Sequence, residues 1–518
     1  MDMTFNQTNP VRRNGRSSRD RREGRKPAEA FPRLPLCLGL LHWLLTFFLE
    51  SFILTAPRTS QLFNYVVCKL ILLPVLVFFW RFLWRALADP ARKKNPERSC
   101  LLYALPYLAV IAVWLVCCRD FFLVGDEINI FTEAASLSSF AYWFQYPTGY
   151  FWIMSCMVLP IPMGPNLIKA LLQALLAGYV VARQARLTGK RTALLLYPMF
   201  LLPFVLDLGV TAQRLPTYGV LFLFFTAKLT YDHLERRRDV KLPEYILLYA
   251  IVGILALWRP EGVYLYPFGF VLLCIAYRER LDRDLLKKLV LYAVTIAVVA
   301  VPQIVGTRDA PAPLSVRSKP LCGYILCNMF RNGLTEEMIS EEREDIEGYL
   351  KLETIRRYNQ ELGDENYYQA YVMDGAEEAD FAAQERFCRA AMHVALRHPG
   401  IYTKTQWNIW KYTNDQYGRS EKDGLPGLLE NLSLASYRVA PACFLVLVFT
   451  VLYAVLRRWL SCAFGLCGLC NWLLVFFTKP AAYPKYFYVD YLLGLFFLST
   501  AVCFVLYNLR SGKHERTH

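Results

Sequence analysis

The chain has 518 residues, of which 55% are apolar and 15% aromatic. This apolar share exceeds that of ordinary soluble domains and predicts an all-α polytopic membrane protein. The net charge of +15 would suit a nucleic-acid-binding protein, but the cations lie in the N-terminal tail and in short loops between apolar stretches. That distribution is typical of the cytoplasmic loops of membrane proteins, so we expect no nucleic-acid partner.

The first 33 residues are polar and basic, and such a segment cannot bury enough apolar surface to fold alone. We interpret residues 1–33 as a disordered cytoplasmic tail. Apolar stretches at 34–56 and 62–84 follow, and each is long enough to span a membrane. Glu50 and Lys69 lie in this hairpin at matching distances from its turn, and a lone charge inside a bilayer is costly. We therefore predict an ion pair between them.

The third apolar stretch, at 100–118, leads to a large external loop at 119–164. The loop begins with FFLVGDEINIFTEAA, which places two adjacent carboxylates, Asp126 and Glu127, where the chain has just left the membrane. A charged side chain gains little from the edge of a bilayer. The acidic pair therefore indicates either a functional site or a solvated helix end.

The second half of this loop, YPTGYFWIMSCMVLPIPM, is apolar but interrupted by proline and glycine. As a membrane span it would move the basic sequence RQARLTGKR to the outside, against the positive-inside rule. We therefore predict an interfacial helix that lies flat on the membrane, with Tyr142, Trp143, Tyr150 and Trp152 in the headgroup region.

The rest of the chain alternates between apolar and polar stretches. Nine further spans are expected, at 165–183, 192–209, 215–232, 243–258, 261–277, 285–305, 437–456, 459–477 and 485–508. Twelve spans in total would leave both termini in the cytoplasm. The expected domains are a transmembrane core at 34–306, an acidic and mostly helical external domain at 307–436, C-terminal transmembrane helices at 437–508 and a basic tail at 509–518.

Charged residues recur where the expected helices meet the outer surface. They are Lys169, Arg214, Arg259, Glu261 and Lys485. Acids and bases that converge on one membrane face can bind an anionic lipid headgroup and activate a hydroxyl, whereas each cation taken singly would serve as an interface anchor.

Other motifs give little support to other functions. The sequence contains no Walker A loop and no GxGxxG fingerprint, so nucleotide-binding functions lack support. His393 and His398 are five residues apart and do not share a helical face, so we assign no metal ligand.

Several short motifs resemble the GT-C superfamily of polyprenyl-phosphate-sugar-dependent glycosyltransferases, which includes protein O-mannosyltransferases and lipid A aminoarabinose transferases. The motifs are GDEINIFTEAASL, YPTGYFW, LWRPEGVYLYPF, RHPGIYTKTQW and YPKYFY. Two spans precede the one that leads to the Asp-Glu loop, where the family commonly has one, and segment 307–436 resembles no domain of that family.

The resemblance implies a membrane glycosyltransferase that takes a sugar from a polyprenyl-phosphate donor and gives it to an external lipid, glycan or protein. Asp126 would be the catalytic base or an acceptor and metal ligand, so a divalent metal ion stays open as a cofactor, and Glu127 would position the acceptor. The remaining assignments are Arg259, Arg214 and Lys485 for the donor phosphate, and Glu261, Tyr146 and Tyr483 for substrate contact.

Two other functions stay open. A transporter or flippase of a polar lipid would place its binding groups near the bilayer midplane and show repeated halves. A non-catalytic scaffold for a surface polymer would need no Asp126. The basic tail and the lack of an organelle signal favour a bacterial plasma membrane.

Overall fold

The computed structural model describes residues 33–58, 61–88, 95–117, 123, 126–137, 146–237, 240–278, 283–308, 319–355, 381–416, 418, 424–479 and 482–515. Within these ranges every regular element is a helix. The expected N-terminal tail up to residue 32, the side chain of Asp126, and Tyr142 and Trp143 lie outside what is described.

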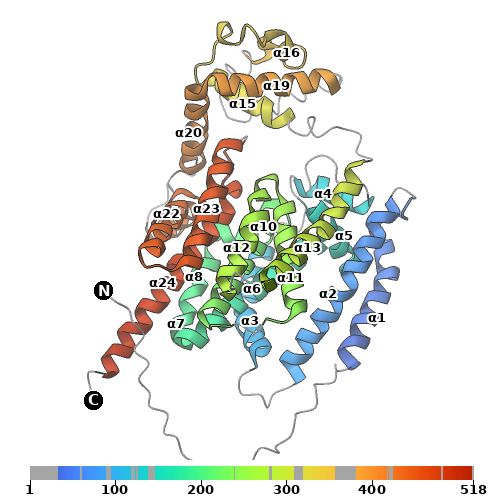
Figure 1. Cartoon of the computed structure of the whole chain (residues 1–518), viewed down its shortest axis with the longest axis vertical. Coiled ribbons are helices and arrows are strands. Elements are labelled where there is room, and N and C mark those ends of the chain that lie inside the picture. Colours follow the sequence, from blue (N-terminus) through green and yellow to red (C-terminus); the bar gives the residue numbers. More distant parts are fainter. Residues whose placement is uncertain are drawn as a thin grey trace, which may run out of the picture.

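The described helices form a large bundle and a smaller module beyond one end of it (Figure 1). The first half of the bundle comprises α1 (Arg33–Leu49), η1 (Glu50–Phe52), α2 (Leu62–Ala88), α3 (Pro96–Cys117), α4 (Asp126–Ala135), α5 (Tyr146–Val158), α6 (Gly164–Thr188), α7 (Lys190–Ala193), η3 (Leu194–Leu196), α8 (Tyr197–Leu201) and α9 (Pro203–Gly209). The second half comprises α10 (Arg214–Leu234), α11 (Leu242–Trp258), η4 (Pro260–Tyr264), α12 (Leu265–Tyr277), α13 (Arg283–Arg308), α21 (Gly424–Ser436), α22 (Ala440–Val455), α23 (Trp459–Thr478), η7 (Pro484–Phe487) and α24 (Tyr488–Glu515). The smaller module comprises α15 (Lys319–Arg331), η5 (Glu337–Ile339), α16 (Arg343–Glu347) and α19 (Phe381–Arg397), and α20 (Pro399–Asp415) connects it to the bundle.

Seven described helices are long and apolar enough to cross a membrane, and the number rises to nine if each of two bent pairs is one span. The pairs bend by 73° at Leu202, between α8 and α9, and by 56° between α21 and α22. The expected number of twelve spans is not confirmed, because α10, α11 and α12 are not among these helices. Helix α11 has 17 residues, or about 26 Å at 1.5 Å per residue, which is less than the roughly 30 Å of a bilayer core.

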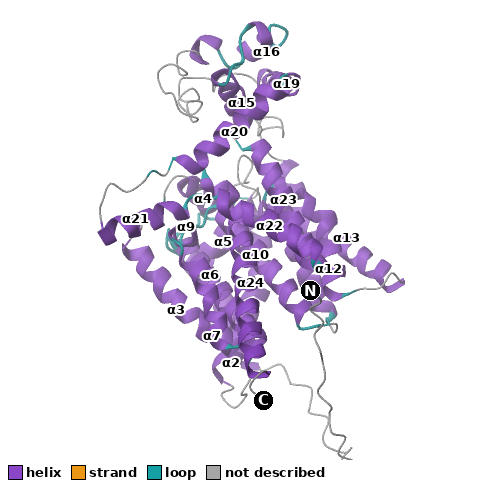
Figure 2. Cartoon of the chain, turned by 90° about the vertical axis from the view of Figure 1, so that its left-hand side faces the viewer, coloured by secondary structure: helices purple, strands orange, loops and turns teal. Residues whose placement is uncertain are grey.

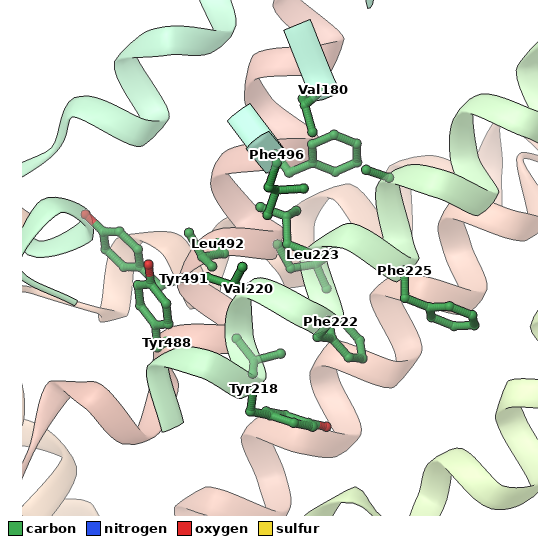
Figure 3. Packing of buried hydrophobic residues seen from close by; sticks show 14 of the residues in the cluster. Val180, Tyr218, Val220, Phe222, Leu223, Phe225, Tyr488, Tyr491, Leu492 and Phe496 are labelled. Carbon is green, nitrogen blue, oxygen red and sulfur yellow. The ribbon is translucent and has the colours of Figure 1, made fainter. Parts of the chain in front are cut away.

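The centre of the bundle is built from α6, α10 and α24, whose large side chains interlock (Figure 3). Tyr218 and Phe222 of α10 and Phe496 of α24 are at most 1% exposed. The two helices approach closely at Gly219, where a Cβ would lie 2.6 Å from a ring carbon of Tyr488. Glycine is therefore required at this crossing, and the crossing fixes the N-terminal ends of α10 and α24 beside each other.

The first hairpin confirms the predicted ion pair. Lys69 Nζ lies 2.5 Å from Glu50 Oε2. Tyr65 donates its hydroxyl to Glu50 Oε1 at 2.5 Å, and Lys69 also donates to Thr46 Oγ1 at 2.8 Å. Both charged side chains are buried between α1 and α2, so the pair joins the two helices.

Helix α5 differs from the interfacial helix that the sequence predicts. Tyr150 is 5% exposed and Trp152 is fully buried, so both side chains are packed inside the protein. Both have hydrogen-bond partners inside the protein, because Tyr150 donates to Asn64 Oδ1 and Trp152 donates to the carbonyl of Ala212. The positive-inside rule could exclude a membrane span here, but it could not distinguish a helix on the membrane from one buried in the bundle.

A buried ion network joins α6, α10, α11 and α12 at the end of the bundle opposite the smaller module (Figure 1). Asp232 is fully buried and accepts hydrogen bonds from Arg183 at 2.8 Å, from Tyr277 at 2.9 Å and from Lys228. Lys228 also donates to Glu244 at 2.9 Å. A buried carboxylate with this many charged partners holds four helices in register.

The smaller module has a hydrophobic core of its own, which is separate from the core of the bundle. Its helices come from segment 307–436, which the sequence assigns to an external domain. Within it, Glu342 lies 2.5 Å from His393 Nδ1 and accepts a hydrogen bond from Arg397 at 3.1 Å. These contacts tie α19 to the turn before α16.

Helix α20 attaches the module to the C-terminal end of α23 (Figure 2). The hydroxyl of Tyr402 donates to the carbonyl of Phe477, and Gln416 donates to the carbonyl of Ala482 at 2.8 Å. The rings of Trp410 and Phe487 meet edge to face at 4.6 Å. The module is therefore held against the same end of the bundle that carries η7.

Candidate functional site

The connection between α9 and α10, residues 210–213, lies where several elements meet. The carbonyl of Ala212 accepts from Trp152 of α5 at 2.9 Å, and the carbonyl of Arg214, at the start of α10, accepts from Trp258 of α11 at 3.1 Å. Val210 accepts from Asn166, at the start of α6, at 3.0 Å. We call residues 210–213 the α9–α10 connection.

Glu127 fixes α4 to this connection. Its Oε1 accepts from Thr211 Oγ1 at 2.5 Å, from Asn166 Nδ2 at 2.8 Å and from the backbone N–H of Ala212 at 3.0 Å. The side chain is fully buried. A carboxylate that accepts several hydrogen bonds from the protein is held rigidly. This placement does not fit the expected contact between Glu127 and an acceptor, and it makes Glu127 a positioning residue for α4.

Asp126 is the first residue of α4 and immediately precedes Glu127. The anchoring of Glu127 therefore also fixes the backbone of Asp126.

Two of the predicted phosphate-binding cations lie beside the same connection. Lys485, in η7, donates to Gln213 Oε1 at 3.3 Å, and its ammonium lies 5.3 Å from the ring centre of Tyr483. Arg214 follows Gln213 directly as the first residue of α10. The side chains of Arg214 and Lys485 are both partly exposed. Arg214 and Lys485 are therefore cations beside the α9–α10 connection that a ligand from outside the protein can reach.

Arg259 lies deeper, with 2% of its surface exposed. Its planar guanidinium binds both carboxylate oxygens of Glu261, with Nε 3.2 Å from Oε2 and Nη2 3.0 Å from Oε1. It also lies 5.7 Å from the ring centre of Tyr218. Arg214 is also close enough to Glu261 to interact with its carboxylate electrostatically. The fork expected to bind a phosphate is therefore occupied by a protein carboxylate.

The other predicted residues are more dispersed. Tyr146, at the start of α5, is 3% exposed, and its backbone N–H donates to Gln303 at 3.4 Å. Tyr483 is 37% exposed and packs near Tyr486. Lys169 is fully buried and donates to the carbonyl of Leu208 in the last turn of α9. Lys169 therefore caps a helix end, which is a structural role.

Several residues that lie near the α9–α10 connection or near Arg259 were not singled out from the sequence. They are Asn166, Thr211, Gln213, Asn471 and Asp490. Asp490 is fully buried, accepts from Asn471 at 2.8 Å and is close enough to Arg259 to interact with it electrostatically. An acid inside the apolar stretch YVDYLLGLFF is the signal that could have identified it.

The described side chains include no group of three or more His, Cys, Asp or Glu residues that could hold a metal ion. The arrangement brings together a helix that begins at Asp126, a connection that fixes this helix, and two accessible cations beside the same connection. A carboxylate can accept a proton from a hydroxyl, and cations can stabilise a departing anion. Comparison with protein-family models, curated proteins and solved structures gives no match.

Proposed function

We propose that this protein is a membrane glycosyltransferase that moves a sugar from a polyprenyl-phosphate donor to an external acceptor. The observation that supports it most is that one short segment, the α9–α10 connection, binds the helix that begins at Asp126 and lies beside two accessible cations, because Lys485 donates to Gln213 and Arg214 follows Gln213 in the chain. A base and an anion-binding pair in one rigid cluster are the groups that such a transfer needs.

In the proposed reaction, Asp126 takes the proton of the acceptor hydroxyl while the acceptor oxygen attacks the anomeric carbon of the donor sugar. The bond between that carbon and the phosphate oxygen breaks, and the polyprenyl phosphate leaves with the bonding electrons. Arg214 and Lys485 stabilise the negative charge that develops on the departing phosphate. Arg259 acts through Glu261, which it holds close to Arg214.

The cell membrane is the proposed location, with both termini in the cytoplasm, and a bacterial plasma membrane is favoured. Segment 307–436 then lies outside the cell, on the side of the cluster. Partners are the donor lipid, the surrounding membrane lipids and the external acceptor. A role for Asp126 as a ligand of a divalent metal ion stays open.

A flippase of a polar lipid is the alternative, and the depth of the charged groups favours the enzyme. Arg214 begins α10, Lys485 lies in η7 and Glu127 is in the first turn of α4. A transporter is expected to place binding groups near the bilayer midplane on broken helices. The helices α8 and α9 are such a broken pair, but Lys169 beside them is bound to the carbonyl of Leu208.

Donor binding tests the proposal. Arg214→Ala and Lys485→Ala should each raise the KM for a polyprenyl-phosphate sugar about tenfold or more in liposomes, because each removes a charge-assisted contact to phosphate. Arg58→Ala is the matched control, since it removes an exposed cation from the turn between α1 and α2. Equal KM values for all three variants and the wild type would contradict the assignment. Movement of donor lipid across the bilayer without sugar transfer would favour the flippase.

A further inference from the structure

A small polar pocket of about 190 Å³ lies between α15 of the smaller module and the connecting helix α20. It is lined by Asn328, Arg331, Asn332, Asn408 and Ile409. Three of these five residues are carboxamides, and none is acidic. The volume is below the roughly 300–1,000 Å³ of pockets for drug-sized ligands, so the pocket suits one small polar unit.

Asn328 is the unusual member of this group. It is 1% exposed, and neither its amide nitrogen nor its amide oxygen has a hydrogen-bond partner among the described residues. Buried polar side chains are nearly always paired, and each exception in a native protein needs an explanation. A side chain that lines a pocket with both a donor and an acceptor unused is placed to bind a ligand that offers both.

The remaining polar groups are held in place by one another. Asn332 donates its amide to the carbonyl of Asn328 at 2.7 Å, and Asn408 donates to Asn332 Oδ1 at 2.5 Å. Lys404, one turn before Asn408, donates to the carbonyl of Asn332 at 3.3 Å. The carboxamides of Asn332 and Asn408 are therefore oriented before any ligand enters, and this reduces the entropy lost on binding.

The chemistry of the pocket indicates its ligand. A carboxamide offers two donors and an acceptor, which match the paired donor and acceptor character of neighbouring sugar hydroxyls. Arg331 and Lys404 add positive charge at the edge of the pocket and favour a ligand that carries an acidic group. We propose that this pocket binds one acidic sugar residue, such as a uronic acid, of an external glycan.

This site is separate from the cluster around the α9–α10 connection and does not depend on the proposed glycosyl transfer. It assigns a binding function to the external segment that the sequence motifs leave without one. Because α20 holds the module against α23, a glycan bound in the pocket is kept near this end of the bundle.

Titration of the purified full-length protein with a glucuronic-acid-terminated oligosaccharide tests the proposal, with the matching glucose-terminated oligosaccharide as the neutral probe. The acidic probe should bind saturably and at least tenfold more tightly than the neutral one. Lys404→Ala should remove most of this preference. Lys411→Ala, which removes an exposed lysine from α20 outside the pocket lining, should not change it.

Asn328→Leu separates binding from a structural role, because leucine has a similar shape and no polar atoms. This variant should lose at least tenfold in affinity while its Tm rises, since an unpaired buried amide is removed. Asn408→Ala should also weaken binding. Because Asn408 is exposed, this variant tests the pocket even if Asn328→Leu misfolds. Unchanged affinity in both variants, no saturable binding to the wild type, or equal affinity for the two probes would overturn the proposal.

Discussion

Replacing Glu127 should loosen the α9–α10 connection, and the size of the effect follows from its three hydrogen bonds. In Glu127→Ala the hydroxyl of Thr211 and the N–H of Ala212 lose their acceptor, while Asn166 keeps its bond to Val210. An unsatisfied buried group costs about 1–3 kcal/mol, so the two together cost about 4 kcal/mol.

Glu127→Gln keeps an oxygen that can accept the same three bonds but removes the charge. A hydrogen bond to a charged group is worth about 1.5–3 kcal/mol, against about 0.5–1.5 kcal/mol for a neutral one. Because a glutamine also retains the fit of the buried site, we expect a loss of about 2 kcal/mol, roughly half that of the alanine variant.

Hydrogen exchange at the Ala212 amide measures this directly, because that N–H donates to Glu127 Oε1. Each 1.4 kcal/mol of lost local stability speeds exchange about tenfold. The amide should therefore exchange at least tenfold faster in Glu127→Gln and faster still in Glu127→Ala, with amides of the α1–α2 hairpin unchanged. Wild-type exchange at Ala212 in the alanine variant would refute the anchoring role.

Three further predictions concern stability, measured by thermal unfolding in detergent. Lys69→Met should lower the free energy of unfolding by about 3–5 kcal/mol, because it leaves the buried Glu50 carboxylate without its cation. The double variant Glu50→Gln, Lys69→Met should lose less than this single variant. Equal losses would argue against the ion pair. Asp232→Ala should lower the free energy of unfolding by about 3 kcal/mol, because Arg183, Lys228 and Tyr277 lose a shared buried acceptor while Glu235 and Glu244 still pair with the two cations, and a loss below 1 kcal/mol would contradict the network. Burial raises the pKa of Glu133 to about 7 from 4.5, so stability should fall by on the order of 1–2 kcal/mol as the pH rises from about 4.5 to about 7, after allowance for solvent screening. Glu133→Gln should flatten that slope, and an unchanged slope would show that another group titrates.

The sequence predicts the α1–α2 hairpin and its ion pair because both depend on features that can be read from the sequence alone. These features are the length of the apolar stretches, the position of the turn and the cost of a lone charge in a bilayer. Most other bundle helices begin and end within a few residues of the expected ranges for the same reason. Hydropathy separates apolar from polar stretches, but it does not distinguish lipid from protein interior. Helix α5 was therefore placed at the membrane surface, although Trp152 is fully buried.

The candidate site was harder to predict because its contacts join residues far apart in the chain. Glu127 and Asp126 are adjacent and look equivalent in the sequence, yet the three donors to Glu127 come from residues 39 to 85 positions away. Arg259 and Glu261 are only two residues apart, and the expectation that Arg259 binds phosphate overlooked this closer partner. The unpaired amide of Asn328 has no signal in the sequence, because it depends on how α15 and α20 meet.

Sugar transfer by Asp126→Asn tests the central claim most directly. Asparagine keeps the size of the side chain and removes the base, while the anchoring by Glu127 is left intact. Transfer from a polyprenyl-phosphate sugar in liposomes, at equal folded yield, should fall by at least a hundredfold, and Glu127→Gln should fall less, because it alters position and not the base. Undiminished transfer by Asp126→Asn would contradict the account.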